Sequence, residues 1–146
     1  MPQGQTFVQK FGQSLTTQSE FGGMFHINGN HWIAAEVNLD TESISSGDPA
    51  GHTPEDDILS ALCWFVGKHV AEITSEQLNE DIMPCSKQDF TRDWWQCGLF
   101  SFNTLAYHFL PKENPLLSTD HRRGDLGRLA MLRKTVNRFN ETVRRF

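Results

Sequence analysis

The chain has few cysteines, no long apolar segment and no amino-terminal pattern of a secretory signal. Its three cysteines, Cys63, Cys85 and Cys97, are an odd number without a C-x-x-C pair. A disulfide framework or a zinc finger is therefore a poor interpretation, and a reducing compartment, the nucleus or cytoplasm, fits best. No apolar run approaches the ~20 residues that span a bilayer, so we expect no membrane association. Residues 1–19 lack the charged and apolar regions of a signal peptide.

Basic side chains are scarce over most of the chain and concentrated at its carboxyl end. Residues 1–117 carry 5 basic and 15 acidic side chains, whereas residues 118–146 carry 8 basic and 3 acidic ones. The two parts attract each other, which favours a basic helix that lies on an acidic body. Contact of the tail with an acidic partner is the alternative. Because the tail has no recognisable DNA-binding motif, nucleic acid is not an expected partner.

The composition predicts a folded core in one domain. Apolar residues make up 38% of the 146 residues, with 11 Phe and 4 Trp. We expect a flexible lead-in over residues 1–20, a core over 21–117 and a basic amphipathic helix over 118–146. The predicted elements are three strands, a helix, a strand and two helices. This order favours an α+β fold with a mainly antiparallel central sheet flanked by helices.

Turn signals divide the first part of the core into strands. Asn28-Gly29-Asn30 separates a short strand over 24–27 from a long, largely apolar strand over 31–39, which we expect at the centre of the sheet. Residues 40–42 then turn the chain into a weaker strand over 43–46. Because these two strands should be antiparallel, His31 at the start of one and Asp48 after the other are expected to be neighbours.

Helices dominate the rest of the chain. Thr53 as N-cap and Pro54 in the first turn predict a helix with apolar residues at three- and four-residue spacing. A short strand over 82–84 and an irregular loop precede a helix that runs from Cys97 to Leu110. The tail helix has an apolar stripe that we expect to face the core or a partner rather than a membrane: Leu129, Leu132, Val136, Phe139, Val143 and Phe146.

Cys97 lies where a polar segment meets a predicted helix. A thiol at a helix N-terminus is at the positive end of the macrodipole, which favours the nucleophilic thiolate. A cysteine protease needs such a thiolate, an imidazole that takes and returns the proton, and a group that orients the imidazole. His31 and Asp48 are available for the last two roles. Cys63 is expected to pack in the core, and nothing supports Cys85 as a nucleophile.

The order and spacing of these residues resemble those of the SUMO and ubiquitin-like-protein cysteine peptidases. The resemblance is carried by His31-Trp32, by Asp48 17 positions later, and by Gln96-Cys97-Gly98 after a further 49. It implies an adenain-like, papain-like fold in which Cys97 is the nucleophile, His31 the general base and Asp48 its orienting acid. Trp32 would line the channel that holds the C-terminal Gly-Gly of a ubiquitin-like modifier. Cleavage would proceed through an acyl-enzyme and need no cofactor and no metal.

The position of the oxyanion donor departs from the family pattern. Relatives carry a glutamine at the position of Thr91, where its amide helps to form the oxyanion hole. Gln88 is favoured in its place, with a loop longer by three residues, and Gln96 is the second candidate. The family also has a larger part before the histidine strand that helps to dock the modifier, whereas thirty residues precede His31 here.

Other functions stay open at this point. A catalytically weak or inactive relic of the same fold would act as a modifier-binding module. An acyltransferase would share the His-acid-Cys scaffold, but the chain has no glycine loop that would cradle the phosphates of an acyl-coenzyme A. The sequence sets neither the modifier nor the oligomeric state.

Overall fold

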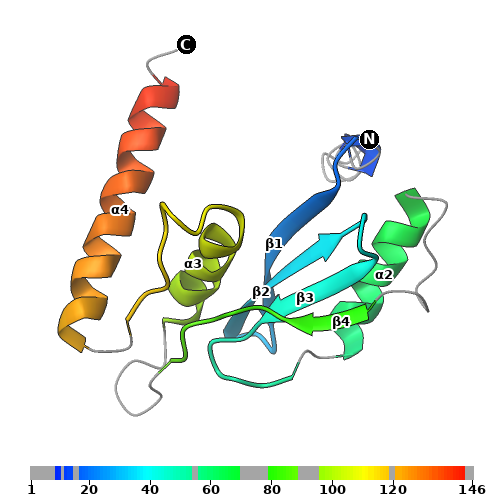
Figure 1. The fold of residues 1–146 in the computed structure, drawn as a ribbon, viewed down its shortest axis with the longest axis horizontal. Helices are drawn as coiled ribbons and strands as arrows, with labels where there is room; N and C mark the ends of the chain where they lie inside the picture. The colour runs from blue at the N-terminus through cyan, green and yellow to red at the C-terminus, as the bar shows by residue number, and fades with distance from the viewer. Residues whose placement is uncertain are drawn as a thin grey trace.

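The computed structural model describes residues 9–10, 12–14, 17–53, 56–69, 79–88, 96–118 and 121–143. Residues 9–10 and 12–14, inside the predicted lead-in, are helical. Pro54 and Thr91, which the sequence analysis singles out, lie outside the described residues. The elements that follow are β1 Glu20–Ile27, β2 His31–Asn38, β3 Ser43–Gly47, α2 Asp56–His69, β4 Asn79–Ile82, α3 Cys97–Phe109 and α4 His121–Val143 (Figure 1).

The first three strands form an antiparallel meander. Asn28 and Gly29 both have positive φ, 51° and 70°, as the Asn-Gly signal predicts for the β1–β2 turn. In the β2–β3 pair, Ala34 lies opposite Gly47, two positions from the register that would pair His31 with Asp48 directly. Because side chains alternate with a period of two, this even shift leaves every side chain on its expected face.

Strand β4 completes the sheet and pairs in parallel with β3, which gives the order β1-β2-β3-β4. It begins three residues earlier than the strand predicted over 82–84 and ends at Ile82, although the Met83 N–H still donates to the Ser46 carbonyl oxygen at 2.7 Å. A parallel pair needs a long crossover, and α2 lies within it. The sheet is therefore mainly antiparallel, as predicted, with one parallel edge strand.

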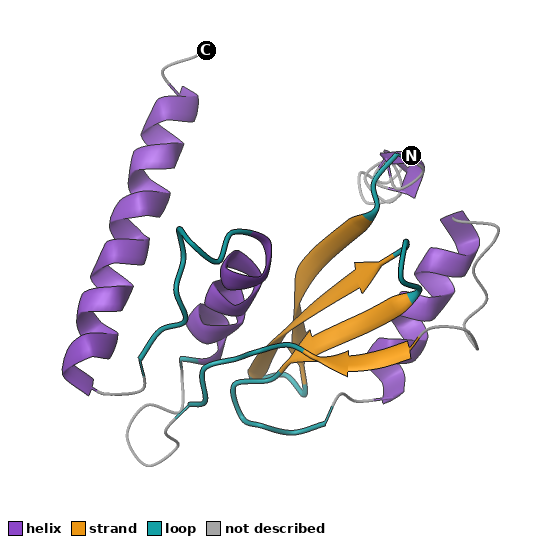
Figure 2. Cartoon of the chain, in the orientation of Figure 1, coloured by secondary structure: helices purple, strands orange, loops and turns teal. Residues whose placement is uncertain are grey.

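Helices cover the two faces of the sheet, α2 on one and α3 on the other (Figures 1 and 2). On the α2 side, alternate residues of β2 and β3 pack against one stripe of the helix to form the apolar core: Ala35, Val37, Ile44, Leu59, Leu62 and Val66. Cys63 packs against this cluster, as expected for a core thiol. Burial on both faces explains why β2 is largely apolar.

Helix α3 lies very close to the sheet because small residues lie beneath it. A Cβ atom added at Gly47 would stand 2.7 Å from the Thr104 side chain, and one added at Gly22 would stand 2.8 Å from Leu105. Ala34, on the strand between them, is fully buried. The Ser101 hydroxyl donates to the Trp32 carbonyl oxygen at 2.8 Å, which fixes the first half of α3 on the start of β2.

Gly47→Ala is expected to destabilise the protein by about 1–3 kcal/mol, because overpacking would push α3 away from the sheet. Denaturant unfolding of the full chain measures this change. Gly23→Ala is the matched control, since its added Cβ would meet the Phe25 ring at an ordinary 3.5 Å. Equal losses in the two variants would contradict the close helix–sheet contact.

Helix α4 stands beside α3, away from the sheet (Figure 1). The apolar stripe of α4 is expected to face the core or a partner, and over the described side chains it does not face the core. Leu129 and Leu132 are 63% and 61% exposed, and Val136 is 47% exposed. Helix α4 makes polar contacts with the body, such as that of Lys134 Nζ with the Glu113 carbonyl oxygen, and these described side chains of the stripe stay exposed beside them. No helix in the described part of the chain is long and apolar enough to cross a bilayer.

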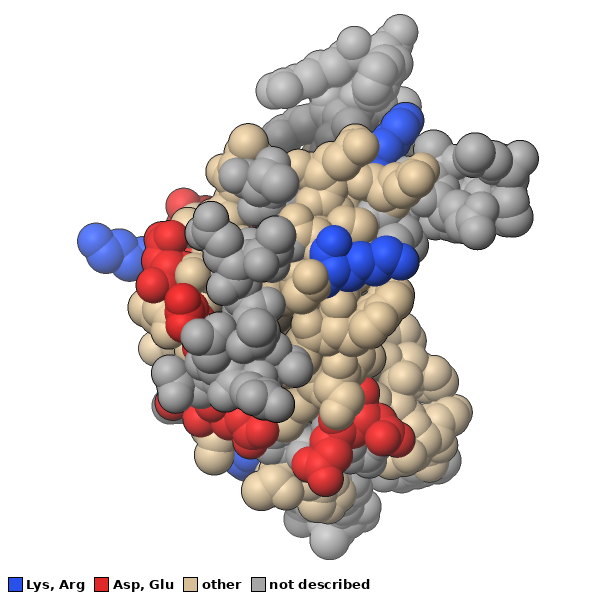
Figure 3. Space-filling view, turned by 90° about the vertical axis from the view of Figure 1, so that its right-hand side faces the viewer, with Lys and Arg blue, Asp and Glu red and all other residues tan. Residues whose placement is uncertain are grey.

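The acidic side chains of the body lie in part on the opposite side of the molecule from α4. The face that carries α2 shows patches of Asp and Glu and fewer Lys and Arg (Figure 3). Asp56 and Asp57, in the first turn of α2, belong to the acidic set, and Lys68 in its last turn is basic. Helix α4 does not lie on this face (Figure 1).

Candidate active site

His31 and Asp48 form the centre of the candidate site. His31 Nε2 and Asp48 Oδ1 are 2.6 Å apart, and the two side chains are 15% and 6% exposed. His31 is the first residue of β2, and Asp48 directly follows β3. The turn between these strands brings the ends together, so the two side chains meet although 17 positions separate them.

The Asp48 carboxylate is held by the backbone as well as by the imidazole. Its Oδ1 also accepts the Ala50 N–H at 2.6 Å, and the Asp48 carbonyl oxygen accepts a bond from Lys87 Nζ at 3.1 Å. His52 Nδ1 lies 3.4 Å from the other carboxylate oxygen, on an exposed side chain. Asp48 therefore caps its own turn and faces His31 at the same time, rather than pointing to solvent.

Cys97 is the first residue of α3 and is 4% exposed. The first turns of α3 lie on the start of β2, where Ser101 bonds the carbonyl oxygen of Trp32, the residue after His31. Asp48 engages Nε2 of the ring, which leaves Nδ1 to exchange a proton with a thiol. Over the residues that the structure describes, no hydrogen bond joins Cys97 Sγ to His31. Such bonds commonly tighten only in the complex with substrate.

The N-terminus of α3 offers hydrogen-bond donors. Gln96 is the N-cap residue and makes no side-chain cap bond, and the first intrahelical bond runs from the Phe100 N–H to the Gln96 carbonyl oxygen at 3.1 Å. The N–H groups of Cys97 and the next two residues therefore lack acceptors within the helix. Backbone donors beside a thiol can stabilise an oxyanion that forms on a carbonyl attacked there.

The two candidate glutamines occupy different surroundings, and both are buried, at 6% exposure for Gln88 and 5% for Gln96. The Gln88 N–H donates to the Pro49 carbonyl oxygen at 2.7 Å, which joins the segment after β4 to the turn that carries Asp48. Gln96 instead accepts a hydrogen bond through Oε1 from the Arg128 guanidinium of α4. Gln96 therefore contacts helix α4 through Arg128, whereas Gln88 contacts the turn after Asp48 through Pro49.

The other two cysteines are in surroundings that disfavour the thiolate. Burial raises the pKa of Cys63, and the carboxylate of Glu80 raises it further. Burial also raises the pKa of Cys85, although the Thr104 hydroxyl, which donates to its sulfur at 3.0 Å, opposes this. A raised pKa keeps the sulfur protonated and weakly nucleophilic. Cys63 and Cys85 are therefore poor candidates for a reactive thiol.

Three contacts of the site were not predicted from the sequence. They are the bonds of Ser101 to the Trp32 carbonyl, of Lys87 to the Asp48 carbonyl and of Arg128 to Gln96. Ser101 follows Cys97 by four positions, so the helical repeat alone would have placed both on one face. The other two join distant segments and leave no local signal.

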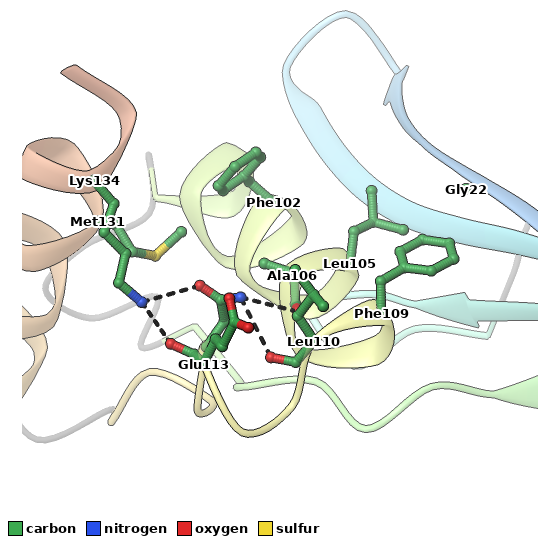
Figure 4. Close-up of a pocket in the computed structure, with 10 residues that line it drawn as sticks. Gly22, Phe102, Leu105, Ala106, Phe109, Leu110, Glu113, Met131 and Lys134 are labelled. Atoms are coloured by element: carbon green, nitrogen blue, oxygen red, sulfur yellow. Dashed lines mark hydrogen bonds between the residues drawn. The ribbon is translucent and has the colours of Figure 1, made fainter. Parts of the chain in front are cut away.

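A cavity of about 600 Å³ lies at the other end of α3, between this helix and α4. Its lining is mainly apolar, with Phe102, Leu105 and Phe109 projecting from α3 (Figure 4). Lys134 crosses its edge to bond the Glu113 carbonyl oxygen and Asn114 Oδ1. None of its lining residues belongs to the site around His31 and Asp48.

Comparisons with known proteins identify the fold. No family model and no curated protein matches the sequence. One similar structure is the SUMO protease Ulp1 with its catalytic cysteine oxidised to a sulfenic acid: 16% identity, TM-score 0.62, covering 81% of this chain and 52% of that chain. Another is the C-terminal Ulp1 protease domain in complex with Smt3, the yeast orthologue of SUMO: 17% identity, TM-score 0.61, with 85% and 55% covered.

The chain therefore has the fold of the Ulp1 protease domains, which confirms the predicted α+β class. It spans about half of the length of those chains. At this level of identity the likeness extends to the fold, and the chemistry has to be argued from the residues of this chain.

Proposed function

We propose that the protein is a cysteine peptidase or isopeptidase that cleaves after the C-terminal Gly-Gly of a ubiquitin-like modifier. The observation that carries this proposal is the 2.6 Å contact between His31 and Asp48 beside a helix that begins at Cys97. The fold shared with Ulp1 supports a protease, and the bound Smt3 in one Ulp1 structure supports a ubiquitin-like modifier as the partner. The proposed chemistry uses side chains and backbone N–H groups of the chain and needs no cofactor.

In the proposed reaction, Cys97 Sγ transfers its proton to His31 Nδ1 and attacks the carbonyl carbon of the last glycine. A C–S bond forms, and the C–N bond breaks as His31 returns the proton to the leaving amine. Water, deprotonated by His31, then hydrolyses the thioester and releases the modifier with a free carboxylate. Asp48 holds Nε2 throughout and stabilises the protonated imidazole.

Trp32 is proposed to form one wall of the channel for the modifier terminus. The indole is 38% exposed, although its neighbours further along β2 are buried. Its ring stands 4.8 Å from that of His26, centre to centre, which supports it from the side of β1. A flat ring next to Cys97 would admit a glycine pair, which has no side chains, and exclude larger residues.

We propose Gln88 as the side-chain oxyanion donor, because its backbone N–H bonds the turn that carries Asp48, whereas Arg128 of α4 holds the Gln96 side chain through Oε1. Gln88→Ala is expected to lower the acylation rate by about 100-fold, the usual cost of removing one such donor. Gln96→Ala is the matched control, a buried glutamine of similar exposure, and should react much faster than Gln88→Ala. Rapid-quench measurements with an activated ester of the modifier terminus give both rates, and the reverse order would assign the role to Gln96.

The proposal is tested by incubating the full chain with Gly-Gly electrophile probes and with C-terminally extended precursors of several ubiquitin-like modifiers. The expected results are a single covalent adduct at Cys97, located by mass spectrometry, and removal of the extension. Binding of a modifier without either reaction would instead support the alternative, a modifier-binding module. The absence of both reaction and binding with every modifier tested would contradict the proposal.

A further inference from the structure

Glu36 is a buried carboxylate in the middle of the sheet. It lies on β2 among residues that are all buried, from Ile33 to Val37, and is itself 2% exposed. One of its carboxylate oxygens, Oε1, makes no hydrogen bond over the part of the chain that the structure describes. Burial raises the pKa of Glu36, and Glu20 adds to this, while His108 and the Ser45 hydroxyl oppose it. A carboxylate in such a place is costly unless a cation balances it.

Two further ligand-type side chains converge on Glu36. His108 Nε2 lies 3.9 Å from Glu36 Oε2 and 4.0 Å from Glu20 Oε2, and the three ligand atoms all lie within 4.8 Å of one another. Glu36 pairs with Gly22, so Glu20, two residues earlier on β1, points to the same face of the sheet. His108, in the last turn of α3, contacts the same face of the sheet.

The distances between His108 Nε2 and the two carboxylates fit three ligands around one metal ion better than direct hydrogen bonds. Distances of 3.9 and 4.0 Å are too long for hydrogen bonds between the imidazole and the carboxylates. The ligands of a tetrahedral metal ion with bonds of ~2.1 Å lie roughly 3.4 Å apart, so small side-chain rotations would close the three groups around an ion. Glu20 and His108 are partly exposed, which leaves an entry path and a position for water.

We propose that Glu20, Glu36 and His108 bind one Zn²⁺ ion. One imidazole and two carboxylates with an open fourth position are a ligand set that zinc accepts. The Asn38 side-chain amide donates to Glu20 Oε2 at 3.5 Å and helps to orient that carboxylate. The ion would balance the buried charge of Glu36 and join β1, β2 and the end of α3.

This site is separate from the candidate active site. His108 lies eleven residues after Cys97 on the same helix, which corresponds to about 16 Å along the axis. The proposal is therefore independent of the proposed peptidase activity, and its test uses binding and spectroscopy rather than turnover.

The test is calorimetric titration of Zn²⁺ into the full chain, in a Cys97→Ser background that removes the thiol at the helix start. We expect one ion per chain and a rise in Tm with zinc. Glu36→Gln and His108→Ala are each expected to weaken binding at least about tenfold. Glu113→Gln, the same change at an exposed position outside the cluster, is the control and should bind as tightly as the parent.

X-ray absorption at the zinc edge gives the ligand types directly. The expected first shell contains only nitrogen and oxygen at about 2.0–2.2 Å, including one imidazole. Circular dichroism verifies that both variants fold. Because two variants are used, the test stands even when one of them fails to fold. No binding, binding that neither variant weakens, or a sulfur ligand at about 2.3 Å would overturn the proposal.

Discussion

Cys97→Ala is expected to abolish reaction with a Gly-Gly electrophile probe and to lower precursor cleavage by about 10⁴-fold or more. The loss should be this large because the covalent thioester has no substitute once the sulfur is removed. Folding should be little affected, since the change removes one small buried side chain at a helix start. Probe labelling followed by mass spectrometry, together with single-turnover cleavage, measures both effects.

The other cysteines supply matched controls for this experiment. Cys63→Ala and Cys85→Ala also remove one partly buried thiol each, and burial raises the pKa of both groups, so labelling should persist. Labelling that persists in the Cys97→Ala protein would contradict the assignment of Cys97 as the nucleophile. Loss of labelling in a folded Cys63→Ala or Cys85→Ala protein would point to the same conclusion.

Asp48→Ala should have the next largest effect, a loss of about 10³–10⁴-fold in kcat. The imidazole would lose the partner that orients Nε2, and the turn would lose its bond to the Ala50 N–H. Asp48→Asn should lose less activity than Asp48→Ala, because an amide oxygen at the Oδ1 position can still accept from both donors, but it should stay impaired because a neutral amide does not stabilise the protonated imidazole. Steady-state kinetics on a modifier precursor give kcat and KM separately, and the loss should fall on kcat.

His52→Ala is the control that distinguishes the orientation of His31 by Asp48 from the effect of any imidazole near the Asp48 carboxylate. The His52 ring also approaches the Asp48 carboxylate, at 3.4 Å, but its side chain is 76% exposed. An exposed pair of this kind contributes little, so this variant should stay close to the wild type. An Asp48→Ala protein as active as the wild type would remove Asp48 from the mechanism.

The pairing of His31 with Asp48 was accessible from the sequence because the signals are local. An Asn-Gly turn, an apolar strand, a polar turn and a weaker strand follow one another, and neighbouring strands in sequence usually pair. The expected register was off by two positions, yet the period of two preserved the faces. The start of α3 at Cys97 was likewise predicted, because a polar segment gives way there to an apolar one.

The features that were missed depend on distant segments. Strand β4 contains Asn79, Glu80 and Asp81, which have poor strand propensity, and its pairing with β3 is set by the tertiary fold. The apolar stripe of α4 predicts a covered face, but its periodicity does not say what covers it. Glu36 reads as one polar residue in an apolar strand, and its neighbour His108 lies far along the chain.

The two halves of the candidate site differ in how far apart their parts lie in the chain, and this bears on the order of folding. His31 and Asp48 are joined by a hairpin of 17 positions, whereas the Ser101–Trp32 bond that fixes α3 spans 69. Closing a short loop costs less entropy than closing a long one, so the acid–imidazole pair can form before the thiol arrives. Reactivity of Cys97 would then appear only when α3 has docked, and probe labelling during refolding would time the last step of assembly.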